Sequence, residues 1–261
     1  MICTQRLSIL AALCFALVTL LTTGLHAQRS AGDRANIDPK FLVDMPVAGI
    51  IPTTAGAVET YLYPNGGLLA AFTYGLLPNL NIGLSFGGTN LIGSGGITWN
   101  NLPGISARYR VMEESNVNPA VVAGFDSQGR DGWIPSMRQY VMKSPGFFVA
   151  VSKNYQFHGT ISFHGGANYT LERNDEDYDP NLYIGMEKSI GPIVSWLAEY
   201  NFAFDNDRNS KGFWNGSLGT GFRISTNIGF NADILFKNLL TSEFPNDKVI
   251  RAIRIQYVRY L

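Results

Sequence analysis

Apolar and polar residues alternate one by one along most of the chain from residue 56 onward. In the clearest segment, Leu80–Phe86, four apolar side chains would share one face of a strand and small or polar side chains the other. One such strand is equally expected in a soluble sheet, but here the opposition repeats. Twelve segments carry it, at 56–63, 68–76, 80–87, 105–112, 118–125, 146–153, 160–170, 181–188, 193–204, 213–223, 227–236 and 249–260.

The connections between these segments alternate in length. Short connections with turn residues are expected at 77–79, 113–117, 154–159, 189–192 and 224–226, and longer ones at 88–104, 126–145, 171–180, 205–212 and 237–248. Outer-membrane barrels have short periplasmic turns and long outer loops, and their tilted strands need about 9–11 residues. We therefore predict an all-β fold, an antiparallel transmembrane up-and-down β-barrel of about 12 strands over residues 56–261, located in the bacterial outer membrane.

The N-terminal part of the chain has a different pattern. Residues 1–27 are typical of a cleaved signal peptide, with Arg6 as the basic residue, an apolar run at 7–21 and Ala27 at the cleavage site. The alternative is a membrane anchor, but the run is shorter than the ~20 residues that a spanning helix needs. Residues 28 to about 44 are polar without a clear period, and we expect residues 28–55 to form a periplasmic lead-in to the barrel.

Composition and charge remove several classes of function. The chain has 20 basic and 20 acidic residues, so its zero net charge gives no support for a nucleic-acid partner. Both cysteines, Cys3 and Cys14, lie in the predicted signal peptide. The mature chain is therefore expected to carry no disulfide, no catalytic thiol and no cysteine-bound metal.

The charged residues of the predicted strands fall on the face opposite the apolar one. Charges on the lipid side cost about 2–4 kcal/mol for Arg or Lys at the midplane, so these side chains should face the lumen. The set is Glu59, Arg108, Arg110, His164, Glu187, Glu199, Arg223, Asp233 and Arg254. Two interpretations stay open: a network of mutually paired charges that fills a narrow lumen, and a polar constriction that selects solutes.

No motif predicts catalysis, a cofactor or a metal. Ser162 and His164 share a strand face, as a nucleophile and base would, but that face is the lumen side and a lipid substrate lies on the other. The glycine-rich run 87–96 lacks the Lys-Ser/Thr ending of a phosphate-binding loop. The acidic stretch 172–179 lacks the ordered ligand spacing of a calcium-binding loop and is expected to be a solvated loop.

Several short runs resemble a known group of proteins. These are Asp44–Ile50, Tyr63–Gly67, Gly87–Gly93, Asn118–Ala120, Gly124–Gly129 and Ser152–Tyr155. They are similar to the YjbH-like outer-membrane barrels linked to exopolysaccharide, and the likeness covers most of the mature chain. It implies an envelope location and a role in polysaccharide secretion, and it transfers no catalytic residues. This chain is short for that group.

The leading hypothesis is a non-enzymatic outer-membrane barrel associated with exopolysaccharide export, with a passive small-solute pore and a lipid-modifying enzyme as alternatives. The expected partners are outer-membrane lipid, the barrel assembly machinery and polysaccharide. We expect the lumen to be largely blocked, because its charges are balanced in sign and should draw together. The loop 126–145, with the apolar Trp133, Ile134 and Met137, is expected to fold over the outer mouth.

Overall fold

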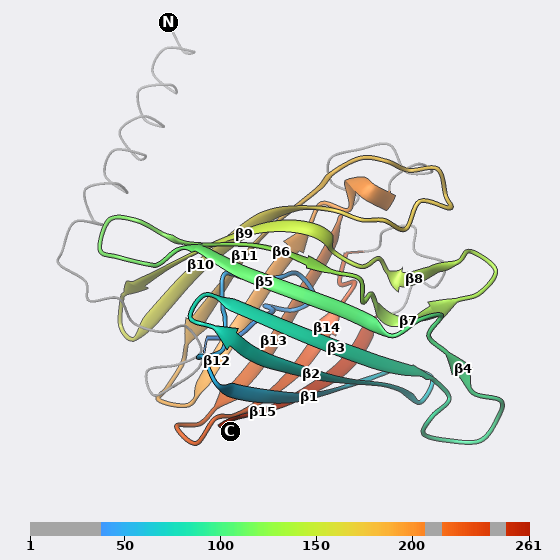
Figure 1. Cartoon of the computed structure of the whole chain (residues 1–261), viewed down its shortest axis with the longest axis horizontal. Coiled ribbons are helices and arrows are strands. Elements are labelled where there is room, and N and C mark those ends of the chain that lie inside the picture. The colour runs from blue at the N-terminus through green and yellow to red at the C-terminus, as the bar shows by residue number, and fades with distance from the viewer. Residues whose placement is uncertain (1–37, 207–215, 241–248) are drawn as a thin grey trace, which may run out of the picture.

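The computed structural model describes residues 38–206, 216–240 and 249–261, and the predicted signal peptide lies outside these ranges. Twelve long strands form the body of the molecule (Figure 1). They are β1 (Ala55–Tyr63), β2 (Gly67–Leu77), β3 (Leu80–Thr89), β5 (Gly104–Met112), β6 (Ala120–Asp126), β9 (Gly146–Gln156), β10 (Thr160–Tyr169), β11 (Asn181–Ser189), β12 (Val194–Asn201), β13 (Ser217–Ser225), β14 (Phe230–Lys237) and β15 (Ile250–Tyr260).

The twelve strands close into a barrel. Each pairs antiparallel with the next one along the chain, and the first and last strands, β1 and β15, pair from Ala55 with Tyr260 to Leu62 with Ile253. Between β6 and β9 the chain forms a small separate hairpin of β7 (Arg130–Ile134) and β8 (Gln139–Met142). The two-residue β4 (Thr98–Trp99) extends the pairing of β3, and the 3₁₀ turn η1 covers Phe204–Asn206.

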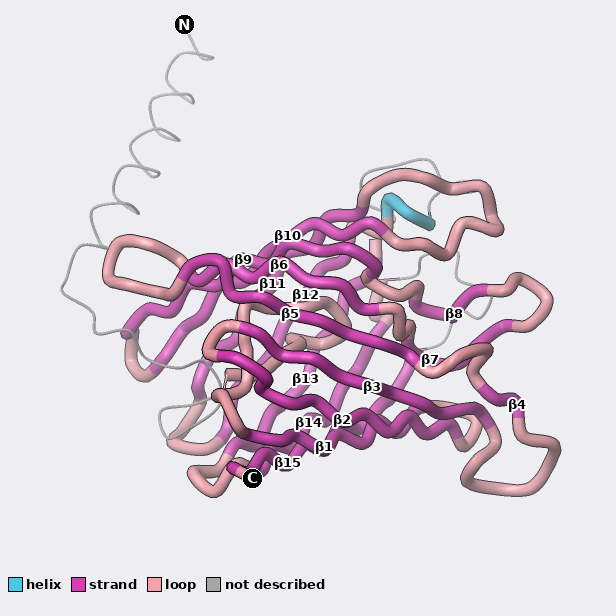
Figure 2. The backbone as a smooth tube through the Cα atoms, viewed as in Figure 1, coloured by secondary structure: helices cyan, strands magenta, loops and turns pink. Residues whose placement is uncertain are grey.

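The two ends of the barrel differ (Figure 2). One end carries the short turns at 78–79, 113–119, 157–159, 190–193 and 226–229, together with the C-terminus. The other end carries the tight hairpin at 64–66 and the long loops that begin after β3, β6, β10, β12 and β14. This is the alternation expected from the sequence, and it identifies the long-loop end as the outer one.

The two faces of the strands have opposite chemistry. On β3, Leu84 is 61% exposed although it is a large apolar residue, whereas Asn81, on the other face of the same strand, is 1% exposed. Apolar side chains on the outside of a closed barrel contact lipid, and the closed ring leaves no backbone edge unpaired in the membrane. The fold class and the outer-membrane location predicted from the sequence are both confirmed. None of the described helical segments is long and apolar enough to cross a membrane.

Candidate functional site

The lumen is filled by the residues that precede β1. Residues 40–47 form a tight hairpin, in which the Leu42 N–H donates to the Met45 carbonyl (3.1 Å) and the Val47 N–H to the Lys40 carbonyl (3.0 Å). Figure 1 shows this blue segment inside the ring of strands. Its residues from 39 to 49 are buried. We call residues 38–51 the plug.

The plug corrects one expectation. The sequence suggested that residues 28–55 precede the barrel as a periplasmic lead-in, but the described part of that range turns back into the lumen. The physical reason is that the barrel wall supplies hydrogen-bond partners for the plug backbone, which has few of its own. The boundary is also shifted by one residue, because β1 begins at Ala55.

Glu199 of β12 holds the tip of the plug. Its carboxylate accepts hydrogen bonds from three consecutive backbone N–H groups, those of Val43 (2.9 Å), Asp44 (3.0 Å) and Met45 (3.1 Å). Hydrogen bonds to a buried carboxylate are stronger than those between neutral groups. The tip is therefore fixed to the wall by its main chain.

Two arginines from the neighbouring strands hold the carbonyl groups of the same tip. Arg223 of β13 donates to the carbonyl of Phe41 (2.8 Å), and Arg254 of β15 donates to the carbonyls of Leu42 (2.8 Å) and Val43 (3.0 Å). Each guanidinium thus uses one nitrogen to bind the plug.

Three of the four remaining nitrogens of these arginines pair with wall carboxylates, and the fourth, Arg254 Nη1, has no hydrogen-bond partner among the described residues. Asp233 of β14 lies between them and accepts from Arg223 Nε (2.8 Å) and Arg254 Nε (2.9 Å). Glu187 of β11 accepts from Arg223 Nη1 (2.9 Å). Buried charges are tolerable only when they are paired and hydrogen-bonded, and this four-residue group meets that condition.

The returning arm of the plug is held by β5. Arg108 Nη1 donates to the carbonyls of Val47 (3.2 Å) and Gly49 (3.3 Å), and Arg110 Nη2 donates to the carbonyl of Ala48 (2.7 Å). Arg110 also pairs with Asp38 at the start of the plug (3.3 Å).

His164 and Glu59 complete the contacts. The Ala48 N–H donates to Ser152 Oγ (3.0 Å), which lies 2.8 Å from His164 Nδ1. Glu59 of β1 pairs with Lys40 of the plug at 3.7 Å.

The structure thus joins all nine side chains proposed from the sequence to the plug, either directly or through one intervening residue. These side chains form ion pairs with one another, as expected, and they also form hydrogen bonds or ion pairs with the plug that lies between them.

A second segment enters the lumen from the outer end. Asp131 at the start of the β7–β8 hairpin accepts from the Tyr61 hydroxyl (2.7 Å) and pairs with Lys237 of β14. The same Lys237 ammonium donates to Asp44 of the plug (3.0 Å) and to the Tyr61 oxygen (2.8 Å). One buried cation therefore connects the outer hairpin to the plug. Met137, at the far end of the hairpin, is exposed.

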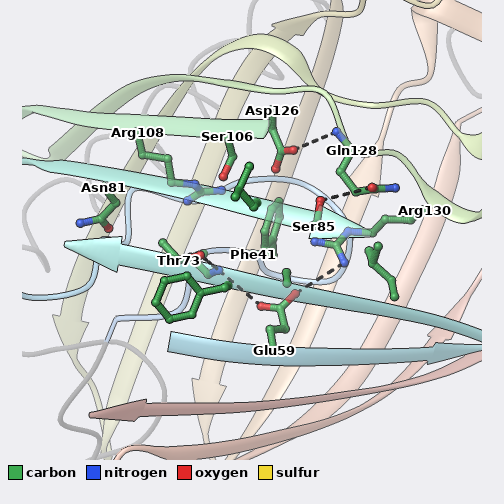
Figure 3. Close-up of a pocket in the computed structure, with 15 residues that line it drawn as sticks. Phe41, Glu59, Thr73, Asn81, Ser85, Ser106, Arg108, Asp126, Gln128 and Arg130 are labelled. Carbon is green, nitrogen blue, oxygen red and sulfur yellow. Dashed lines mark hydrogen bonds and ion pairs between the residues drawn. The ribbon is translucent and has the colours of Figure 1, made fainter. Parts of the chain in front are cut away.

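Phe41 of the plug is sandwiched between two arginines (Figure 3). The guanidinium carbon of Arg130 in β7 lies 4.2 Å from the centroid of the Phe41 ring, and that of Arg108 in β5 lies 4.7 Å from the same centroid. Arg130 also pairs with Glu59 at 3.9 Å. The cavity beside this group is about 30 Å³, which is room for about two water molecules.

The hairpin is also anchored to other outer segments. The Glu172 carboxylate accepts from the Tyr140 N–H (2.8 Å), and Lys143 Nζ pairs with Asp175 and donates to the Asp205 carbonyl (both 2.5 Å). Burial raises the pKa of the Asp205 carboxyl to about 7, and the nearby Lys143 opposes the shift. The Asp205 carboxyl therefore holds its proton more tightly than a free aspartic acid does.

Sequence reasoning missed five residues of this site: Lys40, Asp44, Arg130, Asp131 and Lys237. Asp44 lies in a run that the sequence analysis used only for a family resemblance, and Lys237 sits on the boundary that it drew between a strand and an outer loop. Alternation does mark Lys237 as inward, because it continues the series Asn231, Asp233 and Leu235. Among the described residues, no group of His, Cys, Asp and Glu is arranged to hold a metal ion.

Comparison with known proteins gives structural similarities only. No protein-family model and no curated protein sequence matches the chain. The structure is similar to the outer membrane protein Omp33 of Acinetobacter baumannii, with a TM-score of 0.43 and 10% identity over 78% of this chain and 96% of that one. For the KdgM porin the TM-score is 0.46 at 7% identity, over 78% of this chain and 98% of that one. For the NanC porin it is 0.40 at 9% identity, over 79% and 99%.

Proposed function

We propose that this protein is a non-enzymatic outer-membrane barrel whose passage is held shut by its own plug. The observation that carries the proposal is the attachment of residues 38–51 to the lumen wall through their main chain. A closed passage of this kind serves a conduit that opens on demand better than a pore that is always open.

A steady passive pore is the weaker alternative. Such a pore needs a continuous aqueous path, and the cavity between the plug, β1–β3 and β5 holds about two waters. The lipid-modifying enzyme is weaker still. The Ser162 and His164 side chains are buried on the lumen side, and the hydroxyl beside the His164 ring belongs to Ser152. A lipid substrate would have to reach the interior of the plugged barrel.

We extend the proposal to exopolysaccharide secretion, with the barrel assembly machinery as the partner that inserts the protein. Support for the polysaccharide role is the resemblance of runs such as Asp44–Ile50 and Gly87–Gly93 to YjbH-like barrels. Deleting the gene should lower the amount of secreted polysaccharide, measured as total acid-precipitable sugar in the medium. An unchanged amount would remove the polysaccharide role and leave the closed barrel standing.

The closed state is tested on the full chain in planar bilayers. We expect little or no steady conductance from the wild type. The plug double variant Leu42→Arg/Asp44→Lys should conduct, because it puts a guanidinium at an apolar contact and a second cation beside Lys237. The matched control Val117→Arg/Glu113→Lys adds the same charges to an exposed turn and should stay closed.

The position of the plug is tested by a disulfide. A Cβ atom at Gly219 would lie 3.4 Å from the Val43 Cβ, close to the ~3.5–4.5 Å that a disulfide spans. The double variant Val43→Cys/Gly219→Cys, made with Cys3 and Cys14 replaced by serine, should cross-link on mild oxidation and migrate differently on a non-reducing gel. A large stable wild-type conductance without cross-linking would promote the passive pore to first place.

A further inference from the structure

The lumen wall binds the plug as a peptide. Asn81 of β3 forms two hydrogen bonds with one residue: its side-chain oxygen accepts from the Ile51 N–H (2.8 Å), and its amide nitrogen donates to the Ile51 carbonyl (3.0 Å). A neighbouring β-strand offers the same pair of groups to a residue. At this point the Asn81 side chain of the wall therefore binds the peptide backbone as a neighbouring strand would.

Donors and acceptors are separated along the rest of the wall. Acceptors, Glu199 and Ser152, meet the N–H groups of the plug, and donors, Arg108, Arg223 and Arg254, meet its carbonyls. A polypeptide presents fixed donors and fixed acceptors in this way. A neutral saccharide presents hydroxyl groups, and each hydroxyl is both a donor and an acceptor. Binding a saccharide therefore gives no reason for the wall to separate its donors from its acceptors.

Two glycines of the wall make room for side chains at the tip. A Cβ atom at Gly185 of β11 would lie 2.2 Å from Leu42 Cδ2, and one at Gly219 of β13 would lie 2.9 Å from Val43 Cγ1. A larger residue at Gly219 would have to push the Val43 side chain aside. One at Gly185 would collide with Leu42 and also with the Ala198 carbonyl oxygen of the wall, which would lie 2.7 Å from the added Cβ atom. Leu42 and Val43 belong to a buried apolar cluster that includes Tyr61 and Leu197.

The next residue of the tip adds charge recognition. Asp44 pairs with the buried Lys237 ammonium at 3.0 Å. The wall thus offers two apolar contact sites, for Leu42 and Val43, and then a cation for Asp44. These sites follow the order of the three residues in the chain.

We propose that the lumen is a peptide-binding site whose ligand is a turn of two aliphatic residues followed by an acidic one. The plug is the ligand in cis, and a separate peptide with the same tip binds in trans when it displaces the plug. The inference rests on the proposed function, because a peptide can exchange with the plug only if the plug is a bound and releasable segment. It adds the ligand class, which is polypeptide.

The experiment uses a synthetic peptide of residues 38–51, labelled with fluorescein, and the full-chain Leu42→Arg/Asp44→Lys variant. We expect saturable binding by fluorescence anisotropy and a block of the variant's conductance when peptide is added on the short-turn side. A peptide carrying the same two substitutions should bind about 10-fold more weakly or worse, since it loses the ion pair and the apolar contact. The wall variant Gly219→Leu should weaken the wild-type peptide to a similar extent, because the three atoms nearest to a Cβ atom at this position all belong to Val43.

A second measurement covers the case in which the plug variant does not fold. The full chain with Gly219→Cys, and with Cys3 and Cys14 replaced by serine, keeps the plug sequence unchanged. A peptide carrying Val43→Cys should form a disulfide with it when the peptide displaces the plug. The same peptide with Leu42→Arg and Asp44→Lys should form much less. Trapping of both peptides to the same extent would overturn the inference.

The outcomes separate the two proposals. If the plug variant conducts, but the peptide neither binds to it nor cross-links to the Gly219→Cys chain, the proposed closed barrel is retained and the peptide site is refuted. An acidic oligosaccharide such as oligogalacturonate that displaces the labelled peptide at equal or lower concentration would also refute it, since the site would then favour sugar. A wild type that conducts freely while still trapping the peptide would refute the plug as a closure and retain peptide binding.

Discussion

The plug and the β7–β8 hairpin enter the lumen from opposite ends and are held in different ways. Wall side chains bind the plug mainly through its backbone, at Val43, Asp44 and Met45 on the tip and through carbonyls on both arms. The hairpin is bound to the wall through two charged side chains, Asp131 and Arg130. Hydrogen bonds to the backbone fix the path of the whole segment, whereas attachment through side chains depends on one or two residues.

The difference indicates which closure yields first. To leave the wall, the hairpin must break the ion pairs of Asp131 and Arg130, and its contacts with the outer loops through Tyr140 and Lys143 must yield as well. The plug must exchange a larger number of hydrogen bonds with the wall. The two closures are also linked, because Lys237 binds both Asp44 and Asp131, and Glu59 lies between Lys40 and Arg130. Movement of the hairpin therefore changes the charge balance at the plug. Maleimide labelling of Val43→Cys reports the position of the plug, and labelling of the buried Gln139→Cys reports that of the hairpin.

The largest effect is expected from Lys237→Met, which removes the cation that both segments share. Two buried carboxylates, Asp44 and Asp131, would lose their partner, and such a loss costs about 3–5 kcal/mol. We expect the free energy of unfolding in urea to fall by about this amount, and both reporter cysteines to label faster. The control Lys153→Met removes an ammonium at the short-turn end, which pairs with Glu114 and donates to carbonyls of the turn at 115–118, and it should leave the labelling of both reporters unchanged. Faster labelling of one reporter alone would contradict the linkage.

The next effect is expected from Glu199→Ala, which acts on the plug alone. Three N–H groups of the tip would lose their acceptor, and we expect a loss of about 2–3 kcal/mol with faster labelling at Val43→Cys. The hairpin reporter should be unchanged. Glu199→Gln retains an acceptor oxygen and should lie between the wild type and the alanine variant. Equal labelling of the plug in all three proteins would show that Glu199 does not hold it.

A smaller effect is expected from Asp131→Asn, which acts on the hairpin. The amide keeps an oxygen for the Tyr61 hydroxyl but loses the charge that pairs with Lys237, at a cost of about 1–2 kcal/mol. Labelling at Gln139→Cys should accelerate while Val43→Cys stays protected, because Asp44 then holds Lys237 alone. Exposure of the plug in this variant would mean that the hairpin is required to keep it in place.

The smallest effect is expected from Tyr61→Phe. The hydroxyl accepts from Lys237 and donates to Asp131, so its loss should cost about 0.5–1.5 kcal/mol and leave the apolar contacts of the ring intact. Both reporters should change slightly and together. The decisive comparison is the double variant with Asp131→Asn, whose loss of stability should be smaller than the sum of the two single losses, because the two residues share one hydrogen bond.

The sequence predicts the barrel well because lipid and lumen impose opposite chemistry on alternate residues. All twelve strands are present where the alternation places them, and the least accurate boundary is that of β13, which begins at Ser217 and not at residue 213. Asp233 and Arg254 could be assigned to the lumen for the same reason. Alternation decides the face of a strand and needs no knowledge of the partner.

The plug could not be predicted in this way. Residues 41–47 have no period, and their local hydrogen bonds are limited to those of one tight hairpin. Their position depends on partners far along the chain: Glu199 is 156 residues from Val43, and Lys237 is 193 residues from Asp44. A sequence pattern read in short windows contains no trace of such pairs.

The seam between β1 and β15 bears on how the molecule is assembled. The plug lies directly before β1, and the ring closes only when β1 pairs with β15, the last strand to be synthesised. A tip that contacts β12, β13, β14 and β15 is more easily enclosed by a sheet that curls around it than pushed into a finished ring. The plug then acts as a template, neutralising the concave face while the sheet is still open. We expect substitutions at its tip to slow barrel formation, so the segment that closes the passage would also set the pace at which the barrel forms.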